Sequence, residues 1–276
     1  MIVSTVNVRE PIIDFLMYML SGMCWKPDYM PMREVGMPQM DIDAPRLLAH
    51  CFLFELDAVV EDMNFSNYAR FMDDIDAGVD NIAEAKRIIK SINLTLQTRQ
   101  LRLNAGKTQI LTYKEARKHF KVLENRFLKW LENGIMKTDP DKLEQLLPTI
   151  LKKWHRRRAF DEGNGEKILK RVFTYSIKVG AQLDRVLIYE FLRLRPNIRG
   201  SAFRYLSHVG YKVVDLESIN KIINEGYVCD DNFYVEYAKS LAVAKVEAGD
   251  TFLTVVKEQL VSFVLMTSTV CIALWF

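Results

Sequence analysis

The sequence predicts an α+β fold in which a small N-terminal region containing a β-hairpin precedes an all-helical C-terminal region. Between Tyr68 and Val79, apolar and polar residues alternate around Asp73-Asp74, which predicts two short strands joined by a tight turn at the two acids. From Lys114 onward, apolar residues recur at helical spacing, and Gly and Pro separate successive stripes. We therefore expect only helices in that part of the chain.

The remaining N-terminal elements follow from the same periodicities. Apolar residues at positions 12, 13, 15, 16, 19 and 20 predict a helix from Val8 to Met23, and the Pro- and Met-rich stretch after it predicts a loop. Residues 81–98 form an amphipathic stripe with Asp80 as its expected N-cap. Strand-like alternation returns from Leu101 to Thr112. The later helices are expected at 114–134, 141–154, 166–179, 182–195, 199–209 and 215–225.

Charge is distributed unevenly along the chain. The net charge of +3 conceals a tract from Lys86 to Arg158 with 19 Lys and Arg against 6 Asp and Glu. Such a tract beside a pair of carboxylates suits a polyanionic partner, RNA or DNA. Its densest part is predicted to contact the nucleic-acid backbone, although cations also favour a helix C-terminus. The backbone-binding residues are predicted to be Lys152, Lys153, Arg156, Arg157 and Arg158.

Cysteine usage and the ends of the chain bear on its compartment. The four cysteines are widely spaced, which argues against common zinc patterns and a disulfide framework and indicates a reducing cytoplasm. No secretory signal is recognisable at the start. The last 17 residues, Leu260 to Phe276, carry no charge. Four hydroxylated residues interrupt them, so we expect a buried final helix or a disrupted reading frame in preference to a tail anchor.

The adjacent acids Asp73 and Asp74 are the predicted metal site. Two like charges in one turn repel unless a cation lies opposite, and Mg²⁺ is held by one or two carboxylates together with substrate phosphates. Asp is also a common turn residue, so the pair gains its meaning from its neighbours.

Four blocks occur in the order found in reverse transcriptases. The hairpin, Phe-Met-Asp-Asp with Tyr68 and Arg70 just before it, resembles motif C of that family. Gly36-Met37-Pro38-Gln39 with Asp43 to His50 resembles motif B, and Leu101 to Thr108 resembles motif D. Asp-Ala-x-Arg-Leu-Leu-Ala is most similar to the bacterial antiphage-defence, or abortive-infection, reverse transcriptases. Motif B departs from the family by Met40 in place of Gly, by one extra residue and by Pro45 in place of a frequent Ser.

The resemblance implies a partial polymerase palm over residues 1–112, a thumb-like basic segment over 113–160, and a helical-repeat or solenoid-like domain over 161–276. It implies an RNA-directed DNA polymerase, a nucleotidyltransferase that uses two Mg²⁺ ions and deoxynucleoside triphosphates. The residues matched to the family are Asp73 and Asp74 as catalytic metal ligands, Lys107 as proton donor, and Gly36, Pro38, Gln39 and Arg46 as nucleotide or template contacts.

A motif A aspartate, the remaining metal ligand in the family, has no good match. Asp14 is too close to Gln39 and lies in a helical pattern. We therefore expect the chain to start after motif A, so that either the chain is a fragment or a further polypeptide or subunit supplies that ligand. The alternative function is a non-catalytic remnant that binds nucleic acid or a protein partner. No membrane partner is expected.

Overall fold

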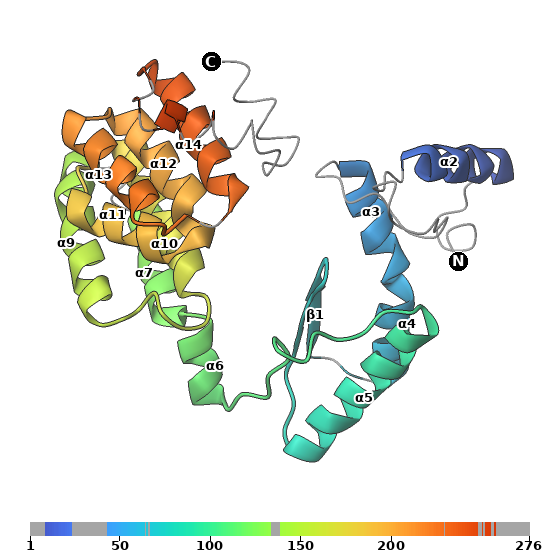
Figure 1. The fold of residues 1–276 in the computed structure, drawn as a ribbon. Helices are drawn as coiled ribbons and strands as arrows, with labels where there is room; N and C mark the ends of the chain where they lie inside the picture. Colours follow the sequence, from blue (N-terminus) through green and yellow to red (C-terminus); the bar gives the residue numbers. More distant parts are fainter. Residues whose placement is uncertain are drawn as a thin grey trace. The chain divides into compact units, whose positions relative to one another are not determined.

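The computed structural model describes residues 9–23, 43–63, 65, 67–133, 139–228, 230–247, 250, 252–254 and 257. It divides into two compact units, Met1–Ile110 and Leu111–Phe276, here called the hairpin unit and the helical unit (Figure 1). Helices predominate, and one two-stranded antiparallel sheet is present among the described residues, which agrees with an α+β or mostly α class. The predictions for Gly36, Pro38, Gln39 and Leu260–Phe276 lie outside these residues.

The hairpin unit consists of short helices and the hairpin. Its elements are α2 (Glu10–Met23), α3 (Asp43–Phe52), α4 (Phe54–Asp62), β1 (Tyr68–Phe71), β2 (Asp74–Ala77) and α5 (Ile82–Thr98). Leu56 and Val60 of α4 and Ile88, Ile92 and Leu96 of α5 form its buried core. Tyr68, Ile75 and Val79 pack against that core. Because a lone two-stranded hairpin is marginal in water, this packing holds the strands in place.

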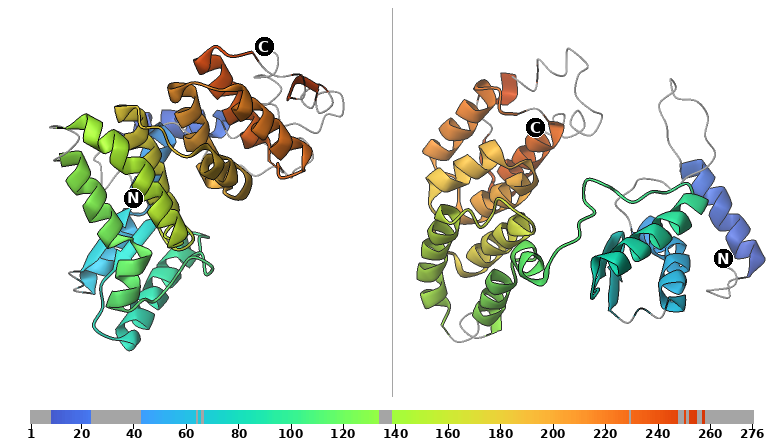
Figure 2. Two further views of the ribbon diagram at one scale, coloured as in Figure 1. Left: turned by 90° about the vertical axis from the view of Figure 1, so that its left-hand side faces the viewer. Right: turned by 90° about the horizontal axis from the view of Figure 1, so that it is seen from below.

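The helical unit is one stack of antiparallel and crossing helices around a single large core. Its elements are α6 (Tyr113–His119), α7 (Val122–Asn133), α9 (Pro140–Arg156), α10 (Gly165–Val179), α11 (Arg185–Leu194), η1 (Pro196–Ile198), α12 (Arg199–Val209), α13 (Val213–Asn224) and α14 (Asp231–Ala244). The apolar faces of α7, η1 and the helices from α9 to α14 meet in one cluster that runs from Leu128 to Phe252, whereas α6 has no buried residue. Both views of Figure 2 show these helices lying directly against one another. None of the described helices is both long and apolar enough to cross a bilayer.

Two expectations for the hairpin unit were wrong. The side chain of Asn81, and not Asp80, caps α5 by accepting from the backbone N–H of Glu84 at 2.9 Å. No strand forms across Leu101–Thr112. The Asn104 carbonyl accepts from the N–H groups of Lys107 and Thr108, at 3.0 and 2.9 Å, and this local turn occupies groups that a strand would pair.

The single helix expected at 114–134 is broken into α6 and α7. Lys121 lies between them with a left-handed backbone angle, φ +49°. The Asn125 amide donates to the Phe120 carbonyl at 2.8 Å, and the Asn164 N–H donates to the His119 carbonyl at the same distance. These bonds satisfy the carbonyls at the end of α6. In addition, α11 begins at Arg185 instead of 182, and α14 was not predicted.

The separate cores predict separable stability. Leu56 is 1% exposed, so Leu56→Ala removes buried methyl groups and leaves a cavity, at a cost of about 2–5 kcal/mol in unfolding free energy. Amide hydrogen exchange is expected to quicken in α4, α5 and the hairpin while α10–α14 keep their protection. An equal rise in exchange across both units would contradict the separation.

Candidate functional site

The turn of the hairpin lies one residue earlier than the sequence indicated. Phe71 pairs with Asp74 and Arg70 with Ile75, so Met72 and Asp73 form the two-residue loop and Asp74 begins β2. Met72 has φ +57°, and Asp73 is not in the positive-φ region. That combination is typical of a type II′ hairpin turn, in which Gly is the preferred first residue. The chain therefore accepts a strained backbone directly before the two acids.

Arg70 connects this turn to helix α4. Its guanidinium makes a bidentate pair with Asp57 of α4, Nε to Oδ1 at 2.7 Å and Nη2 to Oδ2 at 2.5 Å. Nη1 donates to the carbonyl of Met72 at 2.8 Å and lies 3.1 Å from Nδ1 of His50. The Arg70 side chain is only 3% exposed. One buried cation thus links β1, α4 and the strained residue of the turn.

Tyr68 completes this arrangement by donating its hydroxyl to Asp57 Oδ1 at 2.9 Å. Burial raises the pKa of the Asp57 carboxyl, but the hydrogen bonds from Arg70 and Tyr68 outweigh it, and the pKa lies below its usual value. Burial and the bond to Asp57 together raise the pKa of the Tyr68 hydroxyl well above its ordinary value. Asp57 is therefore a fully engaged structural anion.

Asp73 and Asp74 are in the opposite situation. Both are exposed, and neither carboxylate has a hydrogen-bond or ion-pair partner among the described residues. Asp74 and Asp76 lie on the outer face of the hairpin with Phe71, which is 81% exposed. Two adjacent unpaired carboxylates at a hairpin tip can share a divalent cation, with water or phosphate oxygens as its other ligands.

The described residues supply only part of a two-metal site. They contain no group of three or more His, Cys, Asp or Glu side chains placed to hold a metal ion. Asp57 is neutralised by Arg70. Asp14 is exposed on helix α2, which agrees with the helical interpretation of its surroundings. The described residues thus offer a pair of candidate metal ligands and do not form a complete centre.

The other residues matched to the family are only partly located. Lys107 is exposed in the turn that begins at Asn104, so it is accessible. Arg46 lies in helix α3, and its side chain is not described.

The predicted backbone-binding cluster is divided between two surfaces of the helical unit. Lys152, Lys153, Arg156 and Arg157 line a shallow hollow of about 450 Å³ along α9. Arg157 and Arg158 also line a second, larger pocket. Lys152 is already paired with Asp184 at 2.8 Å. The ring of His155 packs on Phe191, and its Nε2 lies 3.5 Å from Oε2 of Glu190. Both contacts are with helix α11.

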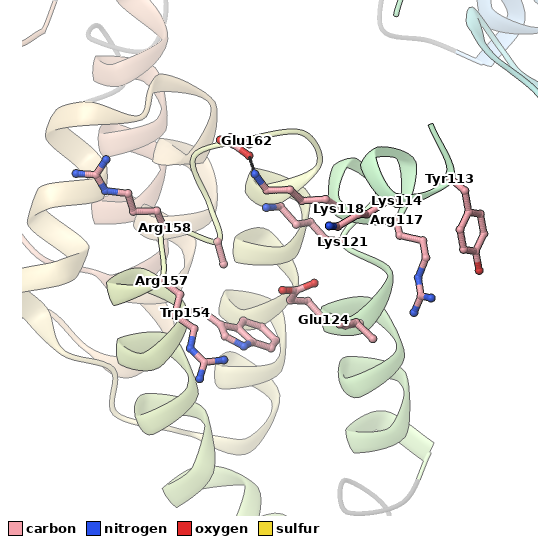
Figure 3. Close-up of a pocket in the computed structure, with 12 residues that line it drawn as sticks. Tyr113, Lys114, Arg117, Lys118, Lys121, Glu124, Trp154, Arg157, Arg158 and Glu162 are labelled. Carbon is pink, nitrogen blue, oxygen red and sulfur yellow. Dashed lines mark ion pairs between the residues drawn. The ribbon is translucent and has the colours of Figure 1, made fainter. Parts of the chain in front are cut away.

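The larger pocket, about 520 Å³, brings α6 and α7 together with the end of α9 and the turn that follows it (Figure 3). Trp154 points into it from α9, half-buried against Phe127 and Phe160. Two carboxylates, Glu124 and Glu162, also line it. Its six basic residues are Lys114, Arg117, Lys118, Lys121, Arg157 and Arg158.

Close backbone contact fixes the two walls of this pocket. Gly163 has φ +55°, and a Cβ there would approach the carbonyl oxygen of His119 to 2.4 Å. A Cβ on Gly165 would approach the carbonyl oxygen of Ala159 to 2.6 Å. The Gly163 approach places the end of α6 directly on the turn after α9, and the Gly165 approach tightens that turn itself.

Sequence reasoning missed both the Arg70 clamp and the α6 side of the pocket. A signal existed for the second: Lys114, Arg117, Lys118 and Lys121 follow the i, i+3, i+4, i+7 spacing that places side chains on one helix face. For the first, Arg70 lies two residues after Tyr68 and opposite Ile75, so it shares the face of the hairpin on which both side chains pack inward.

The clamp predicts a pH-dependent loss of stability in Arg70→Met. At pH 7 the substitution leaves Asp57 without its buried partner, and we expect the hairpin unit to lose about 2–3 kcal/mol in denaturant unfolding. The pKa of Asp57 is lowered on folding, so its contribution is complete above the unfolded value and disappears as pH falls through the folded one. The difference from the unmodified chain should therefore shrink below about pH 3.8.

A matched control is Arg99→Met, which removes the exposed pair between Arg99 and Glu55. Solvent screens that pair, so the cost of removing it should be much smaller. Equal losses of stability in the two variants would contradict the role assigned to Arg70.

Comparison with protein-family models, curated proteins and solved structures found no match to this chain.

Proposed function

We propose that the chain is the palm-containing part of an RNA-directed DNA polymerase of the bacterial defence type, a reverse transcriptase. The observation that carries the proposal is the hairpin tip. Asp73 and Asp74 are exposed and unpaired among the described residues, on a strained turn that Arg70 holds in place. Folding gains nothing evident from leaving two like charges side by side, so a ligand explains them better than stability does.

In this proposal Asp73 and Asp74 hold Mg²⁺. When bound, the metal supplies charge neutralisation for the triphosphate and activation of the primer hydroxyl. The role of the protein is to present both carboxylates on one rigid tip. Lys107, exposed in its turn, is the proposed proton donor to the leaving pyrophosphate. Gly36, Pro38, Gln39 and Arg46 are the proposed contacts to the deoxynucleoside triphosphate and the template.

The proposal requires a third carboxylate from outside the described residues, supplied by a partner polypeptide. The chain by itself is therefore expected to incorporate no deoxynucleotides with Mg²⁺ or Mn²⁺. Robust synthesis by the purified chain would show that its own residues complete the site.

Activity should appear when the tagged chain is recovered from its native cell with its partners. There, Asp73→Asn is expected to abolish deoxynucleotide incorporation, because an amide is a poor Mg²⁺ ligand in place of a carboxylate. Asp76→Asn is the matched control: Asp76 is exposed on the same hairpin, two residues from Asp74, and outside the proposed pair. No incorporation in the recovered complex, or equal effects of the two substitutions, would refute the polymerase assignment.

The second candidate function is a non-catalytic nucleic-acid-binding remnant. It is favoured by the partial ligand set, because no third metal-binding carboxylate accompanies Asp73 and Asp74 among the described side chains. In both candidates the basic helical unit holds RNA or DNA by phosphate contacts.

That shared feature predicts salt-sensitive binding to single strands. Replacing Arg156, Arg157 and Arg158 together with Ala should weaken binding to all sequences alike. It should also reduce the slope of log affinity against log salt by about 0.7 for each phosphate that the variant no longer neutralises. Fluorescence anisotropy over a salt series measures both quantities. Unchanged affinity, or binding that does not respond to salt, would contradict the assignment.

A further inference from the structure

The most unusual residue of the pocket in Figure 3 is Lys121. It is 5% exposed, yet its ammonium makes no hydrogen bond or ion pair with any residue that the structure describes. It experiences attraction from Glu162, but that carboxylate is already paired with Lys118 at 2.6 Å and its side chain is 63% exposed. The ammonium itself is not fully shielded from solvent, because Lys121 lines the pocket. An anionic ligand in the pocket can therefore reach an ammonium that has no close partner to release among the described residues.

The surroundings of Lys121 suit a phosphate. The six basic residues of the pocket outnumber its two acidic ones. Lys118 pairs with Glu162 and Lys121 also attracts that carboxylate, and both side chains point toward it in Figure 3, whereas the guanidinium of Arg158 extends away from them. Lysine ammonium groups bind phosphate oxygens as compact point charges.

The other end of the pocket suits a base. Trp154 lies there beside Arg157. An exposed part of an indole ring offers a stacking surface that accepts any base, and a neighbouring guanidinium can add to it. The volume of about 520 Å³ lies within the range of small-molecule sites.

We propose that this pocket binds a nucleotide, with the phosphate at Lys118 and Lys121 and the base against Trp154. The nucleotide is either a free nucleoside triphosphate or one unit of a single strand. Every residue involved belongs to the helical unit, so the proposal is independent of the hairpin and of polymerase activity.

The test uses the full chain and isothermal titration with three probes: ATP, inorganic triphosphate and a six-nucleotide single-stranded RNA. Lys121→Met should weaken binding of ATP or RNA about tenfold or more, since it removes a charged partner of the phosphate. Lys129→Met is the matched control, because Lys129 is exposed on α7 and does not line the pocket, and it should change affinity less than about twofold. The probe that binds more tightly identifies the source of the nucleotide.

A measurement on the ligand-free chain distinguishes a binding lysine from a structural one. Removing an ammonium that has no close partner among the described residues should leave the melting temperature of Lys121→Met unchanged. A lower melting temperature would mean that Lys121 supports the fold, and would overturn the proposal. Arg117→Gln, on the exposed face of α6, carries little risk to folding and should weaken binding in the same direction.

Three further results would overturn the assignment. The first is no binding of any probe. The second is an equal loss of affinity in Lys121→Met and Lys129→Met. The third is triphosphate binding as tightly as ATP, which would remove the base from the site.

Discussion

The hairpin unit depends on one guanidinium. Arg70 uses its donors on Asp57 of α4 and on the carbonyl of Met72, and it does so almost fully buried. A two-stranded hairpin gains little stability from its own ladder. Its apolar inner face and this bidentate pair therefore fix it to the helices, and the bond to Met72 restrains the left-handed residue of the turn.

The contacts of Arg70 give different environments to aspartates that the sequence alone does not distinguish. Asp57 is held by Arg70 and Tyr68, whereas Asp73 and Asp74 project from the tip without described partners. Arg70 is close to Asp73 and Asp74 in the sequence, but its guanidinium binds Asp57 instead of them. The consequence is a tip whose negative charge is not neutralised by its nearest basic residue, which is what a site for a divalent cation requires.

Hydrophobic periodicity predicted most of the helices, but it failed where one residue determines a helix break or the position of a turn. The stripes at 141–154, 166–179 and 199–209 became helices with nearly the expected ends. The apolar stripe at 114–134 continues through Lys121, so the sequence pattern gives no sign that the helix breaks there. The break follows from the left-handed backbone at Lys121 and from the close packing of Gly163 against His119. The sequence predicted a hairpin turn at Asp73-Asp74, but the one-residue offset of the turn depends on pairing register, which the alternation alone does not fix.

Formal charge overstates how many cations can meet a phosphate. Within the basic tract, Lys118 is paired with Glu162 and Lys152 with Asp184, and Arg99 is paired with Glu55 of the hairpin unit. A paired side chain must give up its partner before it binds an anion, which lowers its net contribution. Lys121 differs because it has no such partner to release among the described residues, and its ammonium lines the pocket. Burial and pairing, more than the number of lysines and arginines, therefore decide where on the helical unit an anion is held most tightly.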